Sequence, residues 1–175
     1  MPSRGVHERL SVADEVSASV GRQARVDDGV EMTGHVLVEL FGEDGQLKDV
    51  REISNLVVTA GKNHIADQLK ATPAQAAMGW MAVGTGSTAP AVGDTALGTE
   101  IDRNALTSRT SATNVVTYVG DWAAGDATNA AIAEAGIFNQ STVGGTMLAR
   151  ATFTAINKGA NDTLQITWTY TLTPS

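Results

Sequence analysis

The most regular pattern of hydrophobic and polar positions lies near the end of the chain, in "LQITWTYTLT", residues 164–173. Hydrophobic residues occupy every second position from Leu164 to Leu172, and threonine or glutamine fills the positions between them. Successive side chains of a β-strand point to opposite faces, so this alternation predicts a strand with one buried face and one threonine-rich outer face. Trp168 and Tyr170 are expected on the buried face.

A second alternating segment, "TGHVLVELFGEDGQLKDV" at residues 33–50, predicts a β-hairpin. Val36, Val38 and Leu40 share one side of its first strand, and "GEDGQ" supplies residues that favour a turn. Residues 53–58, "ISNLVV", continue as an extended segment.

The period changes to that of a helix in "TAGKNHIADQLKA", residues 59–71. Thr59 is expected to cap the N-terminus of this helix, with Ile65, Ala66 and Leu69 on one helical face. Four later segments have the character of short strands separated by loops of small residues. They are "GWMAVG" at 79–84, "NVVTYVGDW" at 114–122, "AEAGIFN" at 133–139 and "GTMLARATFTAI" at 145–156.

Many short strands with glycine and threonine turns and one helix indicate a mainly β fold. We expect a jelly-roll-like β-sandwich with one short α-helix in residues 32–175, preceded by an extended or partly helical N-terminal arm in residues 1–31. The arm is charged and lacks aromatic residues, and two interpretations stand: a tail, or an arm that becomes ordered on a partner. Its candidate partner-binding residues are Arg4, Val6, Arg9, Leu10, Val12, Val16, Val20, Arg22 and Arg25.

Composition excludes several classes of function. The 175 residues include no cysteine, so disulfides, a thiolate nucleophile and cysteine-based zinc sites are excluded. The net charge is −7, and no basic stripe is present to bind phosphates, so no nucleic-acid partner is expected. No hydrophobic run is long enough to span a membrane and no secretory signal is recognisable, so we expect a soluble protein without a membrane partner.

The segment "MAVGTGSTAPAVGDTALGTEIDR", residues 81–103, has the glycine content of a phosphate-binding loop. A P-loop also needs a lysine followed by serine or threonine, but here Gly84 and Gly86 are followed by no lysine before Lys158. The dinucleotide-binding fingerprint fails as well, because Ala89 occupies the place of its third glycine and Pro90 blocks an early helix. Nucleotide binding is therefore not expected.

Other catalytic patterns are also missing. The three histidines, His7, His35 and His64, fall on separate predicted elements, so no metal site is expected. Most acidic residues in the second half fall in expected loops, where Asp94 would cap a short helical turn in "DTALGTE" and others would stabilise turns. These acids are Asp94, Glu100, Asp102, Asp121, Asp126, Glu134 and Asp162. We predict no catalytic residue, no cofactor and no enzymatic activity.

Five segments follow one another along the chain: "NLVVTAGKNHIAD", "MAVGTGSTAPAVGDTAL", "AEAGIFN", "GGTMLARATF" and "DTLQITWT". Together they resemble a group of small structural proteins of tailed bacteriophages and prophages. The resemblance covers residues 33–175 and leaves residues 1–30 outside. It implies a virion component with no catalytic residues, and relatives of this kind are described as head decoration or cement proteins and as tail or fibre-associated proteins.

The leading hypothesis is a capsid decoration protein that stabilises the head by binding across capsid subunits and is assembled in the host cytoplasm. Its expected partners are the major capsid protein and copies of itself in a homo-oligomer, a trimer being one arrangement. A tail, baseplate or fibre-associated structural protein is the alternative. A carbohydrate-binding β-sandwich module is the second alternative, and it would need exposed aromatic rings for sugar stacking.

Overall fold

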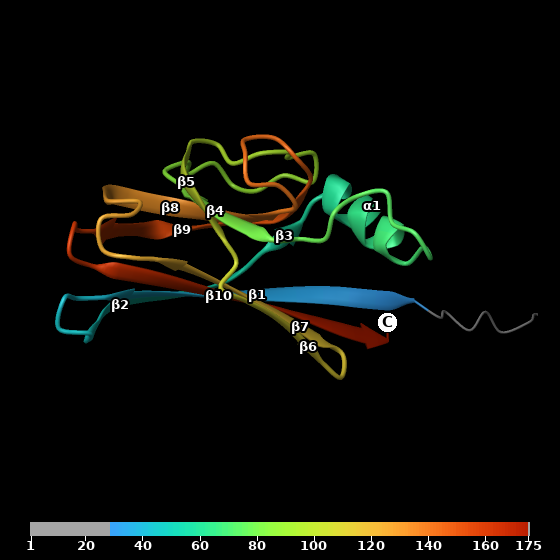
Figure 1. Ribbon diagram of the computed structural model, residues 1–175, viewed down its shortest axis with the longest axis horizontal. Helices are drawn as coiled ribbons and strands as arrows, with labels where there is room; N and C mark the ends of the chain where they lie inside the picture. Colours follow the sequence, from blue (N-terminus) through green and yellow to red (C-terminus); the bar gives the residue numbers. More distant parts are fainter. Residues whose placement is uncertain (1–28, 175) are drawn as a thin grey trace, which may run out of the picture.

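The computed structural model describes residues 29–174 of the chain. These residues form two antiparallel five-stranded sheets that pack face to face, with one helix (Figure 1). Sheet A has the order β2 (Leu47–Ser54), β1 (Val30–Phe41), β10 (Thr163–Pro174), β7 (Val115–Trp122) and β6 (Ser108–Ala112). Sheet B has the order β3 (Leu56–Val57), β9 (Met147–Lys158), β8 (Asn129–Phe138), β4 (Trp80–Gly84) and β5 (Glu100–Ala105). The mainly β sandwich with a single short helix, α1 (Thr59–Gln68), is thus confirmed.

Sheet A forms as its alternating pattern predicts. β10 is the central strand, paired with β1 on one side and β7 on the other. Leu164, Ile166 and Trp168 are buried, and the polar residues between them, Gln165 and Thr167, lie on the opposite face. The hairpin of β1 and β2 is also confirmed, and β1 begins at Val30, two residues before the expected domain boundary.

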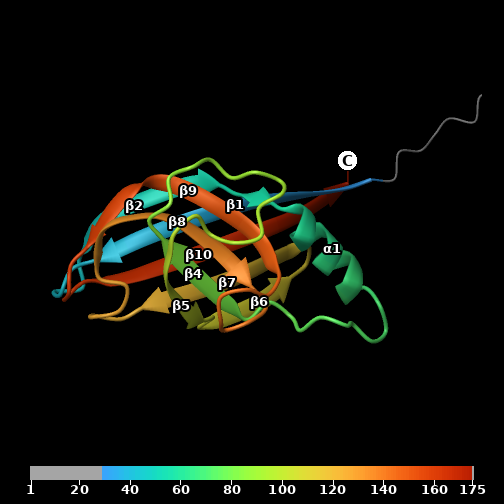
Figure 2. The ribbon, with the colours of Figure 1, turned by 90° about the horizontal axis from the view of Figure 1, so that it is seen from above.

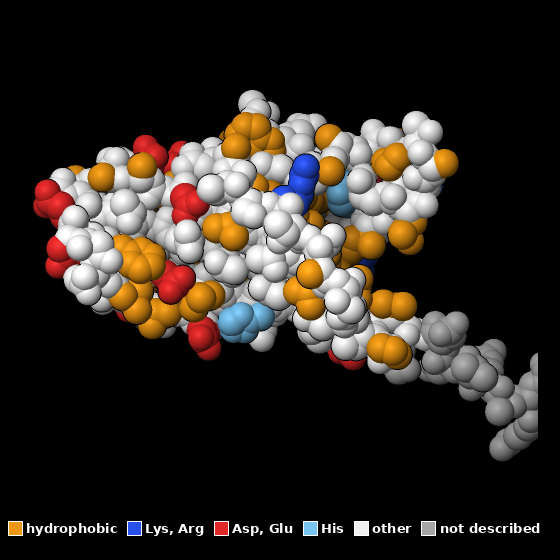
Figure 3. Space-filling model, turned by 60° about the horizontal axis from the view of Figure 1, so that its bottom comes forward, with side chains coloured by type: hydrophobic (Ala, Val, Ile, Leu, Met, Phe, Trp, Pro, Cys, Tyr) orange, Lys and Arg blue, Asp and Glu red, His pale blue; other side chains and the backbone are white. Residues whose placement is uncertain are grey.

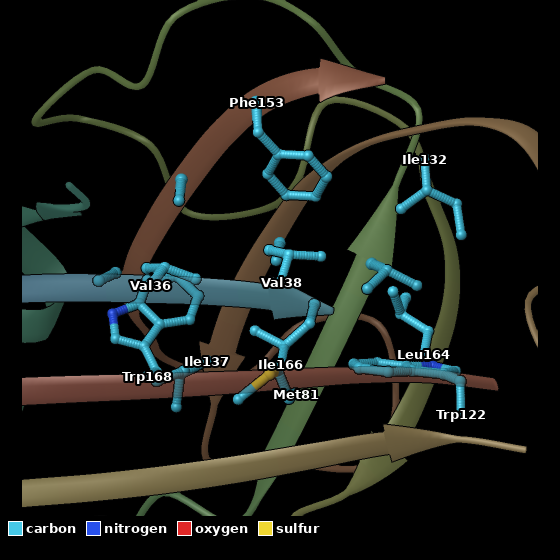
Figure 4. Packing of buried hydrophobic residues seen from close by; sticks show 14 of the residues in the cluster. Val36, Val38, Met81, Trp122, Ile132, Ile137, Phe153, Leu164, Ile166 and Trp168 are labelled. Carbon is cyan, nitrogen blue, oxygen red and sulfur yellow. The ribbon is translucent and has the colours of Figure 1, made fainter. Parts of the chain in front are cut away.

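The main hydrophobic core fills the space between the two sheets (Figure 4). Val36 and Val38 of β1 and Trp168 of β10 meet Met81 of β4 and Ile137 of β8 there, and all five are fully buried. Burying side chains of this size stabilises the fold by about 1.5–3 kcal/mol each relative to leaving them exposed.

Sheet B is buried on both faces. A second cluster, which contains Ala82, Leu97, Phe138 and Met147, lies on its outer side, beneath the loop of residues 85–99 and the loop of residues 139–146. Both loops lie on this side of the sandwich, whereas α1 lies at one end of it, as the view from above shows (Figure 2). Burial on both faces explains why β4 has nearly continuous hydrophobic character instead of a clear alternation.

The helix forms where predicted, but of the three hydrophobic residues expected on one face of it only Ile65 packs against the core. Thr59 is its first residue and not its cap, since Val58 occupies the capping position without a side-chain hydrogen bond. Ala66 is exposed and Leu69 is 85% exposed, whereas Gly61 and His64 are buried. Glycine at 61 lets the helix backbone lie directly against the backbone of β9, because a Cβ there would overlap the carbonyl oxygen of Leu148.

Three local features differ from expectation. The sequence "DTALGTE" forms no helical turn; Asp94 instead closes a turn by accepting a hydrogen bond from the amide of Ala91. β5 and β6 were not predicted, because these strands at the sheet edges are mostly polar and lack alternation. The acids Glu100, Asp102, Asp121 and Glu134 lie in strands and not in loops.

Candidate functional site: a buried ion network and an uncovered sheet face

The glycine-rich loop of residues 85–99 closes over a buried carboxylate. Glu134, on β8, is fully buried, and its Oε1 accepts hydrogen bonds from the amides of Gly86 at 2.8 Å and Thr99 at 2.7 Å. Its Oε2 accepts a hydrogen bond from the amide of Gly98 at 2.9 Å. Backbone amides of this loop therefore do surround an anion, and that anion belongs to the protein.

Arg150 completes the network from the neighbouring strand β9. Its Nε and Nη2 donate to Oε2 of Glu134 at 2.9 and 2.8 Å, and its Nη1 donates to Oδ2 of Asp94 at 2.9 Å. The register of β8 and β9 pairs Gly136 with Arg150, so the guanidinium reaches Glu134 two residues along the same face. The carboxylate of Glu134 thus binds both ends of the loop, and Arg150 joins this carboxylate to Asp94 in the middle of the loop.

The electrostatics of this network favour its charged form. Burial by itself would raise the pKa of Glu134, but hydrogen bonds from the amides and from Arg150 outweigh burial and hold the pKa below its ordinary value. The pKa of Asp94 is also lowered, chiefly by the hydrogen bond from the Ala91 amide, with a contribution from Arg150. A carboxylate held ionised by saturated hydrogen bonds is a poor general acid or base near neutral pH.

A second arginine supports the loop of residues 139–146. Arg103, on β5, donates to the carbonyl oxygens of Gln140 at 3.0 Å and Thr142 at 2.9 Å, and it pairs with Glu100 at 2.7 Å. Its guanidinium also lies 3.7 Å from the centroid of the Phe138 ring. Through these contacts Arg103 holds the loop in place.

Lys158, at the end of β9, is fully buried, and its ammonium donates to the carbonyl oxygens of Ala123 at 2.9 Å and Asp162 at 2.7 Å. Burial lowers its pKa, and the charges of Asp126, Asp162 and Asp102 partly offset that effect. Asp162 accepts hydrogen bonds from the amide of Gly159 and from Lys48, each at 2.8 Å, so it stabilises the β9–β10 turn as predicted.

His35 and His64 do not gather into a metal site, and the third histidine, His7, lies outside the described residues. His35 is exposed on sheet A, with its Nε2 3.9 Å from Glu52, and His64 is buried with its Nδ1 3.3 Å from Gln75. Within residues 29–174 no cluster of three or more potential metal-ligating side chains occurs.

The outer face of sheet A is a candidate binding surface. No helix or loop of the described chain covers this face, which Figure 3 turns toward the viewer. Register places four acidic residues on it and turns Arg51 and Arg109 to the opposite face. Lys48 lies at the irregularity in the pairing of β1 and β2, where register assigns no face. The acids are Glu31, Glu39, Glu52 and Asp121. Its threonines are Thr33, Thr110, Thr117, Thr163, Thr167, Thr169, Thr171 and Thr173.

Aromatic side chains do not contribute a stacking platform. All eight aromatic residues of the chain lie within the described residues, and none is exposed. Trp122 and Trp168 are fully buried in the core, and Trp80 packs against the second cluster.

The sequence-predicted partner residues of the arm, Arg4 to Arg25, all lie outside the described residues. The network of Glu134 and Arg150 was missed by sequence reasoning, although a signal existed. Each is a lone charge within a run of small and hydrophobic residues, "AIAEAGIF" and "MLARATF", and such charges need a partner when buried.

Comparison with protein-family models, curated proteins and solved structures finds no match for the chain. In the part that the structure describes, no helix is long and apolar enough to cross a bilayer.

Proposed function

We propose that this chain is a non-enzymatic structural protein of a bacteriophage virion, a decoration protein that binds across capsid subunits through the outer face of sheet A. The observation that carries the proposal is the uncovered five-stranded face with acidic and threonine side chains. The phage-like segments in residues 33–175 support the virion assignment. The internal bonding of Glu134, Arg150 and Lys158 supports a role without catalysis, because their charges are engaged in holding loops.

The charge on the outer face of sheet A indicates which kind of partner surface it can bind. A face that carries four acids, and from which register turns Arg51 and Arg109 away, complements a basic surface on the capsid. Two copies of this face would repel one another, so self-association would use a different surface. The threonine hydroxyls between the acids can donate and accept hydrogen bonds at the same contact.

Sedimentation of purified protein with capsids that lack it tests the proposal. We expect saturable binding that weakens with added salt, because salt screens exposed charges. Glu52→Lys should weaken binding about three- to tenfold, since one exposed charge contact contributes up to about 1 kcal/mol and reversal makes it repulsive. Glu43→Lys, in the β1–β2 turn, makes the same charge change off this face and should bind as the unaltered protein does.

The outcomes separate the parts of the proposal. Binding to purified tails but not to capsids would remove the head assignment and favour the tail alternative. Capsid binding that Glu52→Lys leaves unchanged would remove the docking face alone. The carbohydrate-binding alternative lacks an exposed aromatic platform, and specific binding on a glycan array would be needed to restore it.

A further inference from the structure

An apolar groove opens at the end of the sandwich beside α1 (Figure 3). It consists of two adjoining hollows, one of about 230 Å³, and Met32, Ile65 and Leu172 line both of them. Helix α1 forms one wall, and the strands of sheet A form the other. The lining is mainly hydrophobic.

Hydrophobic side chains at the rim of this groove remain in contact with solvent. Leu69, which directly follows α1, is 85% exposed, Val30 of β1 is 75% exposed and Leu172 of β10 is 37% exposed. Three exposed hydrophobic side chains around one apolar hollow are typical of a surface that a further segment covers.

We propose that the groove binds this chain's own N-terminal segment, residues 6–20. The described chain enters sheet A at this groove, since Val30 both begins β1 and lines the second hollow. Twenty-nine residues precede Val30. A segment tethered at the rim has an effective concentration in the millimolar range, so even a weak contact is occupied within one molecule before a second copy competes.

The segment has the composition that such a groove requires. Val6, Leu10, Ala13, Val16 and Val20 recur at helical spacing and, wound as a helix, would form one apolar stripe about 20 Å long. Glu8 and Glu15 would fall on the opposite side of that helix, toward solvent. This is the helix-in-groove mode of recognition, with apolar anchors at intervals of three and four residues.

The connection also permits the segment to reverse direction. Nine residues, 21–29, separate Val20 from Val30, and they include Gly21 and the sequence "DDG" at 27–29. Aspartate and glycine favour turns, because aspartate bonds to nearby backbone amides and glycine accepts backbone conformations that other residues avoid.

Because the chain contains no cysteine, a single introduced thiol reports on one position alone. We would measure the thiol labelling rate of full-length Leu69→Cys at the groove rim and of Val143→Cys, an 82% exposed site on the loop of residues 139–146. Adding Leu10→Asp should raise the labelling rate at position 69 at least fivefold and leave position 143 unchanged. Val12→Asp is the matched control, since Val12 lies about 100° from the centre of the stripe and should change neither rate.

A second variant identifies which molecule supplies the segment. Full-length Ala13→Cys/Leu69→Cys should oxidise to an intrachain disulfide, seen as a monomer on a non-reducing gel at all protein concentrations. A disulfide-linked dimer would overturn the proposal in favour of a second copy. Unchanged labelling in Leu10→Asp, together with no disulfide, would overturn it in favour of a groove that this segment does not fill.

Discussion

Replacing Glu134 by glutamine tests whether the ion network holds the glycine-rich loop. The carboxylate accepts three hydrogen bonds from backbone amides and two from Arg150. A glutamine can present its oxygen to only one part of this ring of donors, and its NH₂ group then faces donors. The change therefore breaks hydrogen bonds and leaves the Arg150 charge buried with a single acidic partner, Asp94.

The expected loss is large because the pair is buried. Side-chain exposure is 4% for Arg150 and 0% for Glu134. Removing one partner of such a pair destabilises a protein by about 3–5 kcal/mol, since an uncompensated charge remains in a poorly solvated site. For a domain of this size the loss corresponds to a fall in Tm of roughly 6–20 °C.

Urea unfolding followed by tryptophan fluorescence measures the loss, because Trp122 and Trp168 are buried in the core. Glu52→Gln is the control, since the side chain of Glu52 is 68% exposed and its replacement should change the free energy of unfolding by less than about 0.5 kcal/mol. A loss below about 1 kcal/mol in Glu134→Gln would refute the assignment of the network as a main support of the loop.

Acid titration should detect the contribution of Glu134 to stability. The pKa of Glu134 is lowered in the fold, so the ionised carboxylate stabilises the protein above pH 4.5, and this stabilisation is lost as the pH falls through the lowered pKa. Acid unfolding followed by circular dichroism should therefore show that the stability of Glu134→Gln depends less on pH than that of the unaltered protein. Trp168→Ala should cost about 3–5 kcal/mol in urea unfolding, and Thr167→Ala on the outer face less than about 1 kcal/mol; similar small losses would contradict the burial of that strand. Gly61→Ala should lower the free energy of unfolding by about 1–3 kcal/mol, because the added Cβ pushes α1 away from β9. Gly93→Ala, with open space around it, should leave the free energy of unfolding nearly unchanged in the same assay.

The sequence predicted sheet A better than sheet B for a physical reason. β10 and β1 are buried on one face and solvated on the other, so their hydrophobic positions alternate visibly. Strands of sheet B are covered on both faces, which removes the alternation. The two strands that were not predicted, β5 of sheet B and β6 of sheet A, are mostly polar strands at sheet edges. The helix face was misjudged because periodicity counts hydrophobic side chains, whereas α1 docks through the absence of one at Gly61.

The ion network was harder to predict than the strands. The amides that bind Glu134 lie 35 to 48 residues away along the chain, at Gly86, Gly98 and Thr99. No spacing rule joins such distant positions. The lone charges in β8 and β9 indicate that partners exist, but only the pairing of these strands beneath the loop identifies Arg150 as one of them.

Glycine is needed in this loop for the same physical reason as in a phosphate-binding loop. A Cβ at Gly86 would overlap the carboxylate of Glu134, and a Cβ at Gly84 would lie 2.6 Å from its Oε1. Glycine is needed where an anion occupies the space of a Cβ, as at Gly84 and Gly86, whether the anion is a bound phosphate or a side chain. A glycine-rich loop after a strand therefore indicates that an anion is near, and the lone glutamate in the adjacent strand identifies it as internal. The missing lysine follows from the same arrangement, because Arg150 already supplies the cation from β9.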